Sequence, residues 1–109
     1  MIKAVGIDVV ETERILEAMQ SNVRFSARIL TPRELERTVT PSYLAGRWAA
    51  KEAIAKAVGM HLTWHDVEIT EGDSGRPEVR FLQHKPDGLV HVSISHDRTI
   101  ASAVAIWEE

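Results

Sequence analysis

Residues 40–59 read TPSYLAGRWAAKEAIAKAVG, and they form the longest secondary-structure element that the sequence predicts. Thr40 followed by Pro41 is typical of a helix start, because threonine caps free N–H groups and proline suits the first helical position. Alanine, the strongest helix former, recurs through the segment, and Gly59 is a natural stop. The sequence therefore predicts that the longest helix of the chain lies between these two signals.

Before this helix, the sequence predicts one strand and three short helical pieces. Residues 2–8 are largely apolar and β-friendly and favour a strand. Thr12 can cap a helix whose apolar residues recur at helical spacing, namely Ile15, Leu16 and Met19. A second short piece holds Phe25, Ile29 and Leu30. Thr31-Pro32-Arg33-Glu34 is a capping-box sequence and predicts a third.

Beyond Gly59 the pattern changes to strands, expected over residues 67–70, 78–81, 90–95 and 100–107. Residues 72–75, Gly-Asp-Ser-Gly, predict a hairpin turn. Helices followed by a run of strands indicate an α+β fold. We expect the N-terminal strand to join an antiparallel β-meander, packed against one long and several short helices, in a single domain over residues 1–109.

Composition narrows the class of protein. The 109 residues are 44% hydrophobic, enough for one compact core. No apolar run is long enough to span a membrane. The absence of cysteine excludes disulfides and thiolate metal sites and predicts a cytoplasmic setting. A net charge of −3 argues against nucleic-acid binding. The first third is nevertheless rich in arginine and favours an acidic partner there: Arg14, Arg24, Arg28, Arg33 and Arg37.

Two carboxylates, Asp8 and Glu52, suggest a metal site. Asp8 follows the apolar N-terminal run, whereas Glu52 lies within the long helix. Magnesium is usually held by one or two carboxylates, with waters and substrate phosphates completing its shell. Three cations in the long helix suit phosphate groups: Arg47, Lys51 and Lys56. Together these residues suggest a divalent metal that holds a phosphorylated ligand.

Each carboxylate also has a simpler explanation. Aspartate just past a strand commonly caps or turns the chain into the next helix, so Asp8 has a structural alternative. Glu52 and Lys56 are four residues apart and share a helix face with Trp48, so they fit an ordinary surface ion pair worth about 0.3–0.5 kcal/mol. Spacing alone leaves both alternatives open.

The segment VSISHD, residues 92–97, is a third cluster of polar residues. In a strand, Ser93 and Ser95 share one face, and His96-Asp97 falls at the strand exit, where binding residues often collect. A Ser-His-Asp triad is disfavoured, because adjacent side chains point apart and no nucleophile elbow is present. A histidine that contacts phosphate, or one in a plain turn, fits better.

Four motifs in order resemble those of the holo-[acyl-carrier-protein] synthases, the small 4′-phosphopantetheinyl transferases. They are GIDVVETERI near the N-terminus, RFSARILTPRE, AGRWAAKEAIAKAVG and finally HVSISHD. The likeness covers nearly the whole chain. The GID and KEA motifs together are specific for this family.

The resemblance implies a role for each matching residue. Asp8 and Glu52 would hold Mg²⁺, which engages the diphosphate of coenzyme A. Lys56 would meet that diphosphate and assist transfer, so these three form the expected catalytic set. Around coenzyme A, the expected contacts are Arg47, Lys51, Lys56, Ser95 and His96, with Arg47 and His96 near the adenosine end and its 3′-phosphate.

The resemblance also implies partners. Apo acyl carrier protein would dock its acidic helix on Arg14, Arg24, Phe25 and Arg28, with Met19 nearby. The family assembles as a homotrimer with coenzyme A between subunits. Two departures stand out. Residues 35–43 form a shorter segment than is usual, which affects local lid or carrier contacts, and Trp48 stands where phenylalanine is common.

The implied reaction moves phosphopantetheine from coenzyme A to a carrier serine in fatty-acid biosynthesis and releases adenosine 3′,5′-bisphosphate. The sequence does not choose between Asp8 and Glu52 as the group that helps to remove the serine proton. A rival interpretation is a non-catalytic module that binds coenzyme A or a nucleotide. Such a module would keep Arg47, Lys56 and His96 but would not need both carboxylates.

Overall fold

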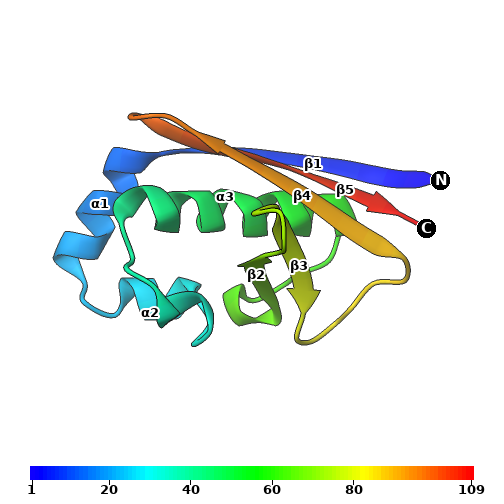
Figure 1. Cartoon of the computed structure of the whole chain (residues 1–109), viewed down its shortest axis with the longest axis horizontal. Coiled ribbons are helices and arrows are strands. Elements are labelled where there is room, and N and C mark those ends of the chain that lie inside the picture. Colours follow the sequence, from blue (N-terminus) through cyan, green and yellow to red (C-terminus); the bar gives the residue numbers. More distant parts are fainter.

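The long helix α3 (Pro41–Val58) lies at the centre of the protein in the computed structural model, which describes residues 1–109 (Figure 1). The Thr40 side chain accepts a hydrogen bond from Tyr43 N at 3.0 Å and caps the helix. Gly59 ends it in the left-handed conformation (φ 64°). Both predicted ends of the helix are confirmed.

Three antiparallel strands cover one side of α3 (Figure 1). They are β1 (Ile2–Glu11), β5 (Ile100–Glu108) and β4 (Leu89–His96), in the spatial order β1-β5-β4. The N-terminal strand therefore joins the C-terminal strands, as predicted. The α+β class is confirmed.

The strands after α3 are divided between two sheets. The sequence predicted a single meander and not this division. Strands β2 (Val67–Glu71) and β3 (Pro77–Phe81) pair only with each other, across the predicted hairpin turn. The chain leaves β3 through His84, whose backbone has the left-handed φ of 58°. It then reaches β4, which pairs with β5 rather than with β3.

The short helices are α1 (Thr12–Ser21), α2 (Phe25–Ile29) and two single 3₁₀ turns, η1 (Glu34–Glu36) and η2 (Trp64–Asp66). The predicted cap at Thr12 is wrong. The helix α1 already begins at Thr12, its N-cap position is Glu11, and the buried Thr12 hydroxyl has no hydrogen-bond partner.

The capping box at Thr31 is confirmed in its hydrogen bonds. Thr31 N donates to Glu34 Oε1 at 2.8 Å, and Glu34 N donates to Thr31 Oγ1 at 3.3 Å. The helix that follows is only the η1 turn, because the chain becomes extended at Arg37 (φ −126°, ψ 171°).

Small side chains allow α3 to lie close to the sheet. Buried alanines line both surfaces, and these include Ala49, Ala53 and Ala57 on the helix and Ala103 on β5. The closest approach is at Gly6 of β1, where an added Cβ would overlap the carbonyl oxygen of Ala53 and lie 2.7 Å from Ala57 N. A strand residue with a side chain does not fit there.

The face of the sheet that points away from α3 carries an apolar patch, beside polar residues of β4. Cross-strand pairs place its members together, for example Val5 opposite Ile106 and Ile7 opposite Val104. We call this set the outer sheet face: Val5, Ile7, Val9, Leu89, Ile100, Val104 and Ile106. Ile7 is 66% exposed and Val9 61%. A contiguous apolar surface of this kind typically marks an interaction site. No helix has both the length and the apolar character to cross a membrane.

Candidate functional site

Asp8 lies where strand β1 passes over the C-terminal half of α3. The close contact at Gly6 brings β1 against the helix, and Asp8 follows two residues later on the same side of the strand. Its Oδ1 accepts a hydrogen bond from Lys56 Nζ at 3.1 Å, and the same ammonium donates to Ile7 O at 3.0 Å. The Asp8 side chain is only 16% exposed, whereas that of Lys56 is 55% exposed.

Glu52 lies one helical turn before Lys56 and projects from the same side of α3. Its half-buried carboxylate makes no hydrogen bond and no ion pair within the chain. Lys56 is therefore flanked by two carboxylates, one from a strand and one from the helix.

This arrangement removes both simpler explanations of the two carboxylates. Asp8 does not cap α1, because it lies inside β1, three residues before the N-cap Glu11. The expected surface pair between Glu52 and Lys56 does not form, since Lys56 is paired with Asp8. The Glu52 carboxylate is free to bind a ligand.

The two carboxylates near Lys56 suit magnesium. They are too few to hold a metal ion without further ligands from water or substrate. No group of three or more His, Cys, Asp or Glu side chains is placed to hold a metal ion. Two carboxylates suit a hard cation that keeps waters and takes its remaining oxygens from a substrate phosphate. The unpaired Glu52 and the second oxygen of Asp8 are the available ligands.

A separate polar groove lies beside the N-terminal half of α3. Two adjoining hollows of about 570 and 280 Å³ share Arg37, Tyr43, Arg47 and Glu71. The Tyr43 ring lies between two guanidinium groups, with Arg37 Cζ 4.2 Å and Arg47 Cζ 4.5 Å from its centre. Burial raises the pKa of Tyr43, so its hydroxyl stays protonated.

Arg47 has unused hydrogen-bonding capacity in this groove. The residue is buried, one of its terminal nitrogens donates to Ile69 O at 3.4 Å, and its Nε has no partner. A buried donor without a partner is costly, and the positive charge of this guanidinium lies beside the groove. The groove is therefore suited to an anionic group such as a phosphate.

His96 reaches the same groove from the end of strand β4. It lines the smaller hollow together with Gly46 and Arg47. Gly46 lets α3 pack closely on β4, because a Cβ there would approach the Ile94 side chain to 3.1 Å. The structure thus brings together Arg47 and His96, the two residues expected at the adenosine end of coenzyme A.

The Ser-His-Asp alternative finds no geometric support. The Asp97 carboxylate accepts hydrogen bonds from Thr99 N and Ile100 N, which shapes the turn between β4 and β5 and lowers the pKa of Asp97. No hydrogen bond joins His96 to Asp97 or to Ser95. Ser95 is exposed on β4 and is not among the residues lining the groove, so its expected ligand contact stays a prediction.

The two groups of predicted site residues lie on opposite sides of α3. Arg47 and Lys56 are nine residues apart, which is about 900° of rotation, or half a turn beyond two full turns. Arg47 faces the groove beside β2, whereas Lys56 contacts β1. The structure does not bring Arg47 and His96 together with Asp8, Glu52 and Lys56 on one surface of the chain.

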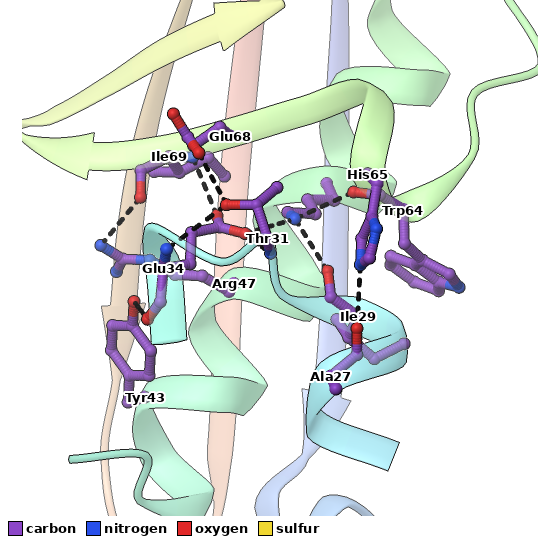
Figure 2. Close-up of polar contacts among 11 residues, drawn as sticks. Ala27, Ile29, Thr31, Glu34, Tyr43, Arg47, Trp64, His65, Glu68 and Ile69 are labelled. Carbon is purple, nitrogen blue, oxygen red and sulfur yellow. Dashed lines mark hydrogen bonds and ion pairs between the residues drawn. The ribbon is translucent and has the colours of Figure 1, made fainter. Parts of the chain in front are cut away.

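The expected contact between Lys51 and a cofactor is corrected by the structure. The Lys51 ammonium is buried and donates to Ile29 O, Glu34 Oε1 and Trp64 O at 2.7–2.9 Å (Figure 2). All three of its protons are used inside the protein, so none is left for a phosphate. Burial lowers the pKa of Lys51, against the raising effect of the Glu34 carboxylate.

The arginines expected to meet the carrier protein are exposed. Arg14 projects from α1, and Arg24 and Arg28 lie at the start and end of α2; none of the three forms an ion pair within the chain. Phe25 is half-buried and stacks on Trp48 with ring centres 5.9 Å apart. Only the remaining edge of Phe25 is available to a partner.

Sequence reasoning missed Tyr43 and Arg37 as parts of the groove. Both fall in the segment of residues 35–43, which differs most from the expected family pattern, and neither belongs to a motif. The one available signal was the run of cations that ends at Arg37, because such a run beside a tyrosine favours cation–π contacts.

Known proteins resemble this chain in sequence over nearly its whole length. The family model described as "4'-phosphopantetheinyl transferase superfamily" matches residues 4–105. A holo-[acyl-carrier-protein] synthase of Geobacillus kaustophilus is 43% identical over 118 aligned positions, covering 99% of this chain and 90% of that protein. The aligned stretch is longer than this chain, so the relative carries residues that have no counterpart here.

Two crystal structures show the same fold. The holo-(acyl-carrier-protein) synthase of Bacillus anthracis, in complex with CoA (3',5'-ADP), is 35% identical with a TM-score of 0.85, covering 99% of this chain and 97% of that one. The synthase of Neisseria meningitidis is 30% identical with a TM-score of 0.88, and the match covers all of both chains.

Proposed function

The chain belongs to the 4′-phosphopantetheinyl transferase superfamily, and from this premise we propose that it is a holo-[acyl-carrier-protein] synthase. It transfers 4′-phosphopantetheine from coenzyme A to a serine of apo acyl carrier protein in fatty-acid biosynthesis. The observation that carries the proposal is Lys56 flanked by Asp8 and the unpaired Glu52, in a chain 43% identical to a curated synthase.

The reaction breaks the phosphoanhydride bond of coenzyme A and forms a phosphoester bond to the carrier serine. The serine Oγ attacks the phosphorus that bears the pantetheine arm, and the bond from that phosphorus to the bridging oxygen breaks. The serine loses its proton, and adenosine 3′,5′-bisphosphate leaves with the bridging oxygen. Either Asp8 or Glu52 can help to remove the serine proton.

The residues around Lys56 divide the work of charge stabilisation. Asp8 and Glu52 would hold Mg²⁺, which when bound neutralises charge on the diphosphate and orients it. Lys56 is held by Asp8 and Ile7 O, yet its side chain is more than half exposed and can reach a phosphate oxygen. A fixed ammonium at that place stabilises the charge that develops on the leaving group.

The groove at Arg47 suits the other end of coenzyme A. Arg37, Arg47 and His96 supply donors for a 3′-phosphate, and the Tyr43 ring packs against both guanidinium groups. The Arg47 guanidinium places a positive charge beside this groove. Crystals of the Bacillus anthracis relative contain coenzyme A.

Because the two halves of the site face opposite sides of α3, we propose that coenzyme A binds between neighbouring subunits of a homotrimer. One subunit would contribute Asp8, Glu52 and Lys56, and its neighbour Arg47 and His96. The outer sheet face provides the apolar surface that such an assembly buries. A cytoplasmic location stays a prediction from composition.

Replacing Ile7 by Asp should dissociate the trimer. Ile7 lies in the outer sheet face, midway along β1, and a buried charge without a partner is strongly unfavourable at a subunit interface. Sedimentation velocity should report trimers for the wild type and monomers for the variant. Val23→Asp is the control, because Val23 is 94% exposed outside the sheet. A monomeric wild type, or a trimeric Ile7→Asp variant, would contradict the assignment.

Charge reversal of Arg14 and Arg24 to Glu should weaken carrier binding and spare coenzyme A binding. Both side chains are exposed and unpaired, so their loss leaves the fold intact. The dissociation constant for apo carrier protein should rise roughly tenfold or more and depend less on salt. Calorimetry measures both ligands separately; an equal loss of both would refute the docking surface.

The rival function is a non-catalytic module that binds coenzyme A, and mass spectrometry separates the two. We expect apo carrier protein, incubated with this protein, coenzyme A and magnesium, to gain the mass of one phosphopantetheine arm. A Lys56→Met variant serves as the control and should transfer far more slowly. Coenzyme A binding without any mass gain on the carrier would favour the rival.

A further inference from the structure

A buried ion pair lies where four segments of the chain meet α3. Lys51 Nζ and Glu34 Oε1 are 2.7 Å apart, and their side chains are 3% and 0% exposed. The Lys51 ammonium also donates to Ile29 O, at the end of α2, and to Trp64 O, at the start of η2 (Figure 2). One side chain of α3 thus ties three separate segments to the helix.

The Glu34 carboxylate extends these ties to strand β2. Its Oε1 also accepts from Thr31 N at 2.8 Å, and its Oε2 accepts from Ile69 N at 2.9 Å. The Thr31 hydroxyl donates to Glu68 Oε1 at 2.7 Å. Every proton of the Lys51 ammonium and both oxygens of Glu34 are engaged, so the pair is satisfied wholly within the protein.

Helix α2 needs such ties because it is too short to hold its own position. It has five residues, far below the length at which a helix is stable alone. The stack of Phe25 on Trp48 holds its beginning, and the hydrogen bond from Lys51 to Ile29 O holds its end. These two contacts act together with the hydrogen bond between His65 Nε2 and Ala27 O at 2.9 Å to set the place of Arg28 relative to α3.

Stability alone is a weak reason to keep this pair. Desolvation of two buried charges often costs as much as their attraction returns, and apolar residues of similar volume serve a core equally well. The pair instead fixes the relative positions of the segments that it joins, because an ammonium with three fixed acceptors allows only one arrangement of them. The next residue along α3 is Glu52.

We propose that Lys51 and Glu34 are positioning residues for the transfer reaction. They hold α2, with its carrier-facing Phe25 and Arg28, at a fixed place relative to Glu52 and Lys56. The carrier serine is thereby delivered to the diphosphate. The proposal rests on the proposed function and adds residues that touch neither the substrate nor the metal.

The first test replaces the pair by a neutral one, Lys51→Met with Glu34→Gln. Met matches the length of the lysine stem, and Gln keeps an oxygen that can accept from Thr31 N. We expect the KM for apo carrier protein to rise roughly 10- to 100-fold, because small displacements at a reacting centre have effects of that size. The KM for coenzyme A should stay within about twofold, because Lys51 lines neither hollow of the groove and the Glu34 side chain, in the wall of the larger hollow, is 0% exposed.

Ile54→Val is the control for a general loss of stability. Ile54 is fully buried on α3 but makes no polar contact with α2. Its variant should lower the melting temperature and leave both KM values unchanged. Equal changes in both KM values of the paired variant, or wild-type kinetics for both substrates, would overturn the positioning role.

A second series keeps the proposal testable if the paired variant does not fold. The chain has no cysteine, so Lys51→Cys introduces a unique thiol. Alkylation in denaturant with bromoethylamine restores an ammonium at nearly the length of lysine, whereas bromopropane gives a neutral chain. After refolding, the ammonium form should recover the wild-type KM for carrier protein, and the neutral form should fold but keep a raised KM.

The outcomes separate the positioning role from the proposed function. A neutral form that cannot fold would show that the pair holds the whole domain together, and would overturn the specific role in placing α2. If wild-type protein transfers nothing to the carrier, the proposed function fails. If wild-type protein transfers normally and the neutral form does so with the same KM for carrier, only the positioning role fails.

Discussion

Glu52→Gln is expected to reduce kcat for phosphopantetheine transfer by roughly 100- to 1,000-fold, the range seen when one group that stabilises developing charge is removed. Glutamine keeps the shape of the side chain but lacks its charge, so it is a poor ligand for magnesium. The magnesium concentration that gives half-maximal rate should rise in parallel. Steady-state transfer at several magnesium concentrations measures both effects.

The fold should not change in this variant, so a lower kcat reports the loss of the carboxylate and not a loss of folded protein. The Glu52 carboxylate has no hydrogen bond or ion pair within the chain, and such substitutions usually alter the free energy of unfolding by less than about 0.5 kcal/mol. Asp73→Asn is the matched control, because it removes one exposed carboxylate from the β2–β3 turn. Full turnover by Glu52→Gln at the wild-type magnesium requirement would rule out the metal role.

The helix ends could be predicted because their signals are local. Thr40-Pro41 and Gly59 act through hydrogen bonds and backbone angles within a few residues of the helix end. The capping box at Thr31 succeeded for the same reason. By contrast, the pairing of strands depends on contacts between distant segments, so the division of the sheets was not visible in the pattern of apolar residues.

The role of Lys51 could not be predicted for a related reason. A lysine beside Arg47 on an alanine-rich helix is typical of a polar surface, and Glu34 in a capping box is usually exposed. Their burial follows from the way η1 folds back onto α3, which brings together groups 17 residues apart. Charge and spacing therefore assigned Lys51 and Lys56 alike to a phosphate ligand, whereas the structure leaves only the Lys56 side chain exposed.

Gly6→Ala is expected to destabilise the protein more than any other single-methyl addition discussed for this chain. The new Cβ would overlap the carbonyl oxygen of Ala53 and lie 2.7 Å from Ala57 N. Both atoms belong to the backbone of α3, so no flexible side chain can move aside. The strand must shift away from the helix, and Asp8 must move with it.

The expected cost is about 3 kcal/mol in the free energy of unfolding, the upper end of the usual range for overpacked cores. Urea unfolding followed by circular dichroism measures it, and any folded fraction should transfer phosphopantetheine slowly, because Asp8 no longer meets Lys56. Gly59→Ala is the matched control: its Cβ meets nothing within 4 Å, so the variant carries only the left-handed backbone cost of about 1–2 kcal/mol. If Gly6→Ala were no less stable than Gly59→Ala, the close packing of β1 on α3 could not be what holds Asp8 at the site.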